Sequence, residues 1–256
     1  MTLLWLNLVV CIKVGIFGCG WLGRALAKTL QHEYTVYGAV RSLTSSARLE
    51  QEHIKAFCLP EIGSEFWNVE ILVIAISPRH QYLKTLTEIA NNMTAKTQQI
   101  ILLSTISVYK EEIGLINEMS EVDPTKLSVQ GELLFKKIFS KGSIIRLGGL
   151  MGDDRIAGQW GSKVLSDSTV NYLHQRDAVG IIEAVIKQKI SDDVINAVSP
   201  EHPKRSKIYK MNCKRFGWEL PTFTKGEEKI ILSVKSENLL GYHYIFKDPM
   251  CFWADS

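Results

Sequence analysis

The chain has 256 residues, a length that fits one large α/β unit with an appendage and buries a core without disulfides or metals. Hydrophobic residues make up 46% and charged residues 22%, which excludes a disordered or fibrous protein. The 30 basic and 27 acidic residues leave a net charge of +3 with no block of one sign, too balanced for a protein that coats nucleic acid. Five scattered cysteines form no C-x-x-C pair, so we expect no disulfide framework, no metal site and a reducing cytoplasm.

The first segment, residues 1–11, is apolar but has no basic residues before it and is too short to span a bilayer. We interpret it as an N-terminal extension rather than an export signal or membrane anchor. The expected protein is therefore cytoplasmic and has no membrane partner.

Strand-like and helix-like segments alternate along the rest of the chain. Short apolar or β-branched runs predict buried strands, in chain order, at 12–17, 35–40, 54–59, 70–77, 99–109, 143–147 and 193–198. Apolar residues at helical spacing predict helices at 21–32, 80–91, 128–141 and 177–188, and a solvated amphipathic helix face at 204–215. Glycine, proline and polar residues predict loops without elements at 110–126 and 148–161.

This alternation predicts an α/β fold with a doubly wound parallel sheet of the Rossmann type. Residues 12–148 would form the dinucleotide-binding domain. Residues 149–256 would form a small substrate-cap region, interleaved with the last helix and strand of the sheet, over the carboxyl ends of the strands where such folds bind ligands.

Residues Gly18 to Gly23 form a G-x-G-x-x-G that follows a predicted strand and opens a predicted helix. In this context Gly18 allows a tight turn, Gly20 lets the backbone approach a pyrophosphate, and Gly23 lets helix and strand pack closely. The N–H groups of the helix start would bind the phosphates. The alternative is a tight turn without a ligand. The cofactor-binding residues predicted here are Gly18, Cys19, Gly20, Trp21, Leu22 and Gly23.

The position that selects between NAD and NADP is basic. An NAD-preferring fold places an acidic residue after the second strand, whereas this chain has Arg41 followed by Ser42. A guanidinium there would bind a 2′-phosphate, so we predict NADP in preference to NAD. The alternative is a solvated surface arginine.

Several ordered blocks resemble the extended short-chain dehydrogenase/reductases, the NAD-dependent epimerase/dehydratase family, and an atypical subgroup of it in particular. They are IFGCGWLG, LLSTISVY, EMSEVDPTK, IIRLGGLMGDDR, VNYLHQRDAVGII, VINAVSPEHP and LLGYHYIFKDP, and they span residues 12 to about 249. The resemblance implies a catalytic hydroxyl at Thr105, and cofactor contacts at Ser77 and at Ser104, the residue next to Thr105. It also implies that Arg146 and Arg155 support the substrate loop, with Arg155 able to meet an anionic substrate such as a nucleotide sugar.

The chain departs from the family at the Tyr-x-x-x-Lys pair. Counted from Pro124, those positions hold Ser128 and Glu132, and neither can act as a phenol whose pKa is lowered by a lysine. Tyr109 and His174 remain as candidate acid–base groups, each with a structural alternative: a packed tyrosine and a hydrogen-bonded histidine.

Other singled-out residues have structural alternatives too. Thr105 could instead satisfy backbone groups at its strand end. Arg146 and Arg155 could form ion pairs with acidic neighbours, namely Asp153, Asp154 or Asp177.

The expected function is an NADP-dependent oxidoreductase that transfers hydride to or from a carbonyl or carbinol carbon of a small molecule. The alternatives are a non-catalytic NADP(H)-binding sensor or scaffold and a nucleotide-sugar epimerase. No nucleic-acid partner is expected, and the protein would be a monomer or a homodimer.

Overall fold

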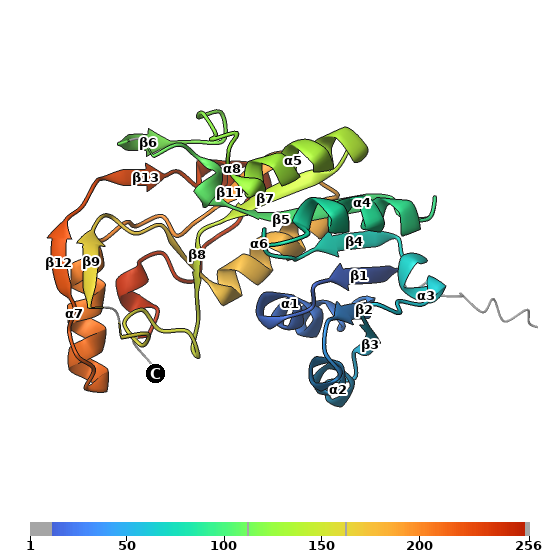
Figure 1. Cartoon of the computed structure of the whole chain (residues 1–256), viewed down its shortest axis with the longest axis horizontal. Coiled ribbons are helices and arrows are strands. Elements are labelled where there is room, and N and C mark those ends of the chain that lie inside the picture. The colour runs from blue at the N-terminus through green and yellow to red at the C-terminus, as the bar shows by residue number, and fades with distance from the viewer. Residues whose placement is uncertain (1–11, 112, 162, 254–256) are drawn as a thin grey trace, which may run out of the picture.

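The computed structural model describes residues 12–111, 113–161 and 163–253, so the interpretation of residues 1–11 lies outside the described residues. Its centre is a seven-stranded parallel sheet in the order β11-β7-β5-β4-β1-β2-β3 (Figure 1). The predicted doubly wound α/β fold is therefore confirmed. The strands are β1 (Lys13–Phe17), β2 (Thr35–Val40), β3 (Lys55–Cys58), β4 (Ile71–Ile74), β5 (Gln99–Thr105), β7 (Ser143–Leu147) and β11 (Val194–Ala197).

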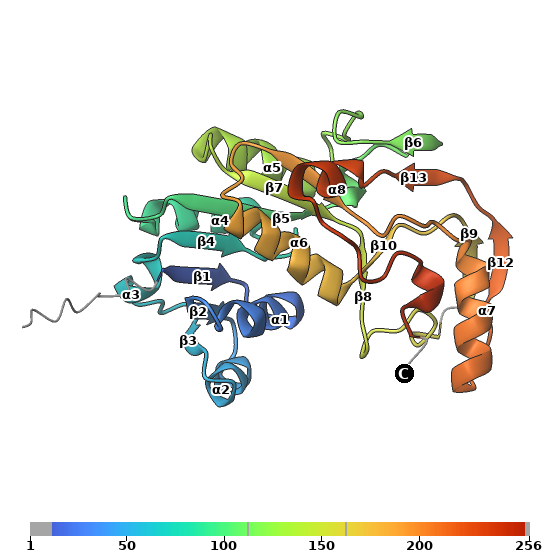
Figure 2. The same ribbon diagram turned by 180° about the vertical axis from the view of Figure 1, so that it is seen from behind.

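Helices cover both faces of the sheet, as Figures 1 and 2 show from opposite sides. Alternate strand residues therefore enter two separate cores. In β5, Ile101 and Leu103 join one core while Ile100 and Leu102 join the other. This two-sided burial explains the nearly continuous apolar runs of the strands. One face carries α1 (Trp21–Leu30), α2 (Leu43–Gln51), α6 (Gln175–Lys187) and α8 (Val234–Leu240), and the other α3 (Ser64–Trp67), α4 (Tyr82–Asn92) and α5 (Leu127–Ile138).

The remaining elements lie beyond the carboxyl edge of the sheet (Figure 1). They include three two-stranded parallel pairs: β8 (Gly149–Met151) with β10 (Tyr172–His174), β9 (Val164–Asp167) with β12 (Thr222–Lys225), and β6 (Gly114–Ile116) with β13 (Lys229–Ile231). The prediction that 110–126 and 148–161 hold no elements is wrong at β6 and β8. Each is a three-residue strand whose partner lies far along the chain, so neither has a local signature. The helix expected at 204–215 is present as α7 (Arg205–Phe216).

The C-terminal segment is tied to α6 by one carboxylate. Asp177 is fully buried and accepts hydrogen bonds from the Tyr242 hydroxyl at 2.9 Å and from the amides of Ile245 at 2.7 Å and Phe246 at 3.0 Å. Further on, the buried Trp253 donates its indole N–H to the carbonyl of Gly152 at 3.0 Å. The Asp177 bonds hold residues 242–246 against α6, and the indole bond holds Trp253 against the loop that follows β8. Within the described residues, no helix is both long enough and apolar enough to cross a membrane.

Candidate functional site

Parallel pairing brings the ends of β1, β2, β4 and β5 to one edge of the sheet, where most of the predicted site residues lie. The glycine loop joins β1 to α1 at this edge. Gly18 has φ +92°, and a Cβ there would lie 2.7 Å from the Ala75 carbonyl oxygen. A Cβ on Gly23 would lie 2.9 Å from the Gly18 carbonyl oxygen. Both positions therefore require glycine for the turn and for close packing of helix on strand.

Gly20 requires glycine for no such internal reason. A Cβ there would meet only the Gly18 carbonyl oxygen, at 4.0 Å, so the space beside this residue is open. The first helical hydrogen bond of α1 runs from the Arg24 amide to the Gly20 carbonyl oxygen. No side chain among the described residues caps this helix. The first-turn amides thus lack helical acceptors beside an open backbone. This arrangement fits a diphosphate, which would approach closer than any side chain permits.

The other loop residues anchor this backbone. Cys19 and Leu22 are buried in the core, and burial, the largest effect, raises the pKa of the Cys19 thiol to about 12. The amides of Gly18 and Cys19 both donate to the carbonyl of Ala39 at the end of β2, at 3.1 and 2.8 Å. The thiol therefore stays neutral, and the loop is held against the strand that precedes Arg41.

The charge that was predicted to select the cofactor lies in the open. Arg41 is exposed immediately after β2. Ser42 caps α2, where its hydroxyl accepts from the Ser45 amide at 3.2 Å. Ser77 is exposed just beyond β4. All three lie at the same edge as the glycine loop.

Thr105 ends β5 with a partly exposed side chain. Its hydroxyl accepts from the Ser107 amide at 3.2 Å and donates to the Ser107 hydroxyl at 3.1 Å, capping η1 (Ile106–Val108). Thr105 therefore fulfils the backbone-satisfying role, and it remains the catalytic candidate with access to solvent.

Ser104 points instead into a buried polar network beneath the site. Its hydroxyl donates to Glu132 at 2.5 Å, and Glu132 forms a bidentate ion pair with Arg146. Arg146 also donates to the Tyr109 hydroxyl at 3.0 Å, which in turn donates to Asn196 at 2.7 Å. The ion-pair alternative for Arg146 is therefore realised, with Glu132 rather than with a nearby aspartate.

Tyr109 and His174 are both enclosed by protein. Tyr109 is fully buried, and burial raises the pKa of its phenol. His174 is 1% exposed and stacks on Phe246, with ring centroids 3.9 Å apart. Its Nδ1 accepts from the Arg176 amide at 3.2 Å, which caps α6, and burial lowers the pKa of the imidazole. Both side chains therefore occupy the structural positions weighed as their alternatives. Ser128 is also buried, at the second position of α5.

Trp21 connects the glycine loop to the loop after β8. Its indole N–H donates to Asp154 Oδ1 at 2.8 Å, and the Arg155 guanidinium lies 4.1 Å from the centre of its ring. Gln175 Nε2 donates to the Trp21 carbonyl at 3.1 Å. Neither Asp154 nor Gln175 was predicted from the sequence, because both lie far from Trp21 along the chain. Arg155 makes no ion pair with any described carboxylate.

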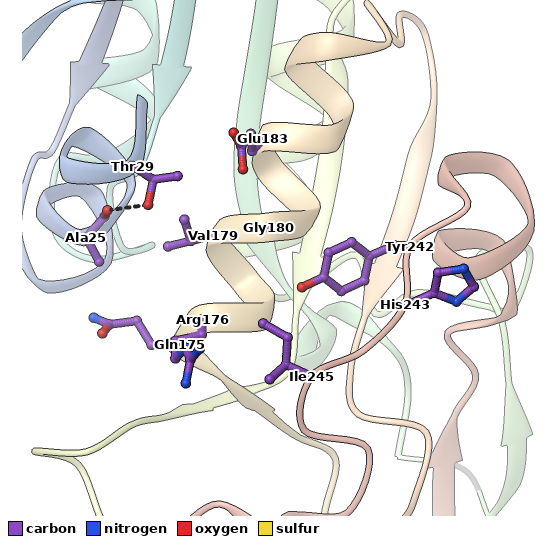
Figure 3. Close-up of a pocket in the computed structure, with 10 residues that line it drawn as sticks. All are labelled: Ala25, Thr29, Gln175, Arg176, Val179, Gly180, Glu183, Tyr242, His243 and Ile245. Atoms are coloured by element: carbon purple, nitrogen blue, oxygen red, sulfur yellow. Dashed lines mark hydrogen bonds between the residues drawn. The ribbon is translucent and has the colours of Figure 1, made fainter. Parts of the chain in front are cut away.

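A separate hollow of about 410 Å³ lies between α1, α6 and residues 242–245 (Figure 3). Its walls include Thr29, Glu183 and Tyr242, but no residue of the glycine loop. Figure 3 shows the Tyr242 hydroxyl directed toward α6 at Gly180. This hollow contains none of the predicted site residues.

Comparisons with known proteins identify relatives of this chain and structures that share its fold. No family model matches the chain. Protein YeeZ of Escherichia coli is 28% identical over 267 aligned residues, which cover 93% of this chain and 97% of YeeZ. A functionally unknown conserved protein from Silicibacter pomeroyi superposes with a TM-score of 0.81 at 17% identity, over 94% of this chain and 96% of that one.

UDP-glucuronic acid 4-epimerase from Bacillus cereus, in complex with NAD, superposes with a TM-score of 0.79 at 17% identity, over 94% of this chain and 96% of the epimerase. A short-chain dehydrogenase/reductase superfamily protein from Agrobacterium tumefaciens with bound NAD gives a TM-score of 0.73 at 13% identity, over 93% and 94% of the two chains. The chain has the fold of this epimerase and of this superfamily protein. The fold that the sequence resemblance implied is thus confirmed across almost the whole chain.

Proposed function

We propose that this chain binds a nicotinamide dinucleotide at the glycine loop, NADP(H) in preference to NAD(H), and is an oxidoreductase acting on a carbonyl or carbinol carbon. The observation that carries the proposal is the open backbone at Gly20 beside the uncapped start of α1. The epimerase and the short-chain dehydrogenase/reductase superfamily protein that share this fold were both solved with NAD bound, which supports the same cofactor class here.

Different residues at the sheet edge bind different parts of the cofactor. The first-turn amides of α1 hold the diphosphate, while Arg41 and Ser42 face the 2′-phosphate of the adenosine ribose. The backbone at Ser77 passes the bridge between the two nucleotides. When bound, the nicotinamide supplies or accepts hydride.

Thr105 is the residue we assign to the substrate oxygen. Its hydroxyl now donates to Ser107, and it would redirect that proton to a carbonyl oxygen of a bound substrate. Tyr109 and His174 are buried, and they support the surrounding loops through their hydrogen bonds. Because the epimerase with this fold is recorded with UDP-glucuronic acid, nucleotide sugars are the first substrates to test.

The test combines binding and turnover in one set of measurements. NADPH should raise the melting temperature, because a ligand that binds only the folded state stabilises it. Nucleotide sugars, aldehydes and ketones are then screened by the nicotinamide absorbance. Binding with oxidation or reduction of one substrate class supports the proposal, and failure of every dinucleotide to bind overturns it.

A second candidate function, binding of NADP(H) without turnover, is favoured by one observation. The position assigned to the family lysine holds Glu132, which forms a buried ion pair with Arg146. Glu132 supplies no cation to lower the pKa of a phenol, and the pKa of Tyr109 is raised because burial outweighs the opposing effect of Arg146. An epimerase, which needs a strong acid and base, is disfavoured for the same reason. Tight binding of NADPH with no substrate turned over would select this sensor or scaffold role.

A further inference from the structure

Trp21 occupies an unusual place for a large side chain, inside the glycine loop and against the loop after β8. Its ring edge touches Gly152, where a Cβ would lie 3.0 Å from the indole. The ring therefore fills the space between the start of α1 and residues 152–155. A tight turn, closed by hydrogen bonds between the backbones of Gly152 and Arg155, presents the Arg155 side chain to it.

Arg155 has a free set of donors at this position. A guanidinium stacked on an aromatic face keeps its in-plane N–H groups available for a planar anion. No described residue accepts a hydrogen bond from this side chain or pairs with its charge. Because the guanidinium stacks on the first residue of α1, it lies near the positive end of that helix, and both groups favour an anion.

We propose that Arg155, positioned by Trp21, is a ligand of the dinucleotide diphosphate, completing from the substrate loop the site that the α1 amides begin. This inference rests on the proposed function and deepens it. It assigns Arg155 to the cofactor rather than to an anionic substrate, because its supporting ring belongs to the glycine loop itself. It also couples the two parts of the site, since the diphosphate would hold residues 152–155 against α1.

Asp154 provides a second test, because its charge should affect diphosphate binding in the opposite direction to that of Arg155. Its carboxylate accepts from the Trp21 indole at 2.8 Å, so a negative charge also lies near the diphosphate position. Replacement by asparagine keeps an oxygen acceptor for the indole and removes the charge. Asp154→Asn should therefore bind a diphosphate more tightly, whereas loss of Arg155 should weaken binding.

The experiment titrates the full-length protein with ADP-ribose, which carries the diphosphate, and with adenosine 2′-monophosphate, which does not. Arg155→Met should weaken ADP-ribose about tenfold or more, since hydrogen bonds between charged groups are at least this strong. It should leave adenosine 2′-monophosphate within about twofold. Arg155→Lys should recover part of the loss, and Trp21→Leu should reproduce part of it. Arg176→Met is the matched control, because that guanidinium lies on the Phe246 ring outside this site.

The outcomes separate the two proposals. If the unmodified protein binds no dinucleotide, the proposed function fails and this inference fails with it. If it binds ADP-ribose and Arg155→Met binds equally well while remaining folded, only the role of Arg155 is wrong. If Arg155→Met weakens UDP but not ADP-ribose, Arg155 serves a nucleotide-sugar diphosphate and the inference is overturned. If Arg155→Met does not fold, the affinities of Arg155→Lys and Asp154→Asn for ADP-ribose decide. Weaker binding by the first and tighter binding by the second support the inference, and unchanged affinities overturn it.

Discussion

Glu132 and Arg146 form a bidentate ion pair in which both side chains are less than one tenth exposed, with Nη2 2.7 Å from Oε2 and Nε 3.1 Å from Oε1. The pair joins α5 to β7 under the predicted catalytic residues. A cation at position 132, as the family resemblance would require, would face Arg146 and repel it. The local charge pattern is therefore built around a carboxylate at this place.

Breaking this pair should be costly. Glu132→Gln leaves the Arg146 charge buried without a counter-ion, and we expect a loss of about 3–5 kcal/mol in the free energy of unfolding. Chemical denaturation measures it. The double variant Glu132→Leu, Arg146→Met removes both charges and should be more stable than either single variant. A Glu132→Gln protein as stable as the unmodified chain would contradict the buried pair.

The open space at Gly20 predicts a selective loss of binding. Gly20→Val places a side chain where the diphosphate would lie but meets no protein atom at its Cβ closer than 4.0 Å, so the fold should persist. We expect NADPH to raise the melting temperature of the unmodified protein and not that of this variant. Gly63→Val is the control, because its Cβ would also meet nothing within 4 Å and its φ is −62°. Equal protection of both variants would rule out this site.

Cofactor preference should follow the charge of residue 41. A charge-assisted hydrogen bond contributes about 1.5–3 kcal/mol, which corresponds to roughly ten- to hundredfold preference for NADPH over NADH. Arg41→Asp should weaken NADPH at least tenfold and leave NADH within a few-fold. Added salt should reduce the preference because Arg41 is exposed. Arg48→Asp, on the exposed surface of α2, should change neither affinity. Equal affinities of the unmodified protein for both cofactors would show that Arg41 contacts solvent only.

If the protein turns over a substrate, its kcat should depend strongly on the Thr105 hydroxyl. Thr105→Val removes the hydroxyl, and loss of one donor to a developing oxyanion lowers kcat about 10²–10³-fold. Thr105→Ser keeps the donor and should retain most activity, as should Ser128→Ala, whose hydroxyl is buried. Steady-state rates with unchanged melting temperatures make the comparison. Full activity of Thr105→Val would remove this residue from the mechanism.

His174 predicts a loss of stability in acid. Burial lowers the pKa of the imidazole below its ordinary value of 6.5 and outweighs the opposing effect of Asp153 and Asp177. The unfolded chain therefore binds this proton more readily than the folded one. Stability should be full above about pH 6.5 and should fall as the pH drops below it. His202, whose pKa is lowered by burial as well, adds to the same slope.

Denaturation curves at several pH values test this dependence. His174→Asn can still cap α6 through its side-chain oxygen but does not titrate, so its stability should fall less steeply below pH 6.5. His202→Gln should leave the His174 part of the slope in place. A slope unchanged by both substitutions together would show that other groups cause it.

The sequence predicts the parts of this molecule whose signals are local. The strands of the sheet and the glycine loop are predictable because apolar runs, helical spacing and the G-x-G-x-x-G lie within short segments. The roles of Gly18 and Gly23 were likewise readable, and the structure shows the contacts that require them. Arg41 and Ser77 reach the same edge because parallel strands end there.

The remainder depends on partners distant in sequence. β6 and β8 are too short to have a periodic pattern and exist because β13 and β10 pair with them. No sequence signal near Arg146 indicates that its counter-ion is Glu132, which lies on a different element. The stacking of Arg155 on Trp21 joins two loops that only the complete fold brings together.

The hydrogen bonds of Asp177 have a consequence for the synthesis of the chain. All three donors lie between residues 242 and 246, so they are synthesised only after every strand of the central sheet, the last of which ends at Ala197. Until then a carboxylate destined for the interior has none of these donors, and α6 cannot complete its packing. A premature stop codon before residue 242 should therefore yield a product that cellular proteases degrade, although every strand of the central sheet has been translated.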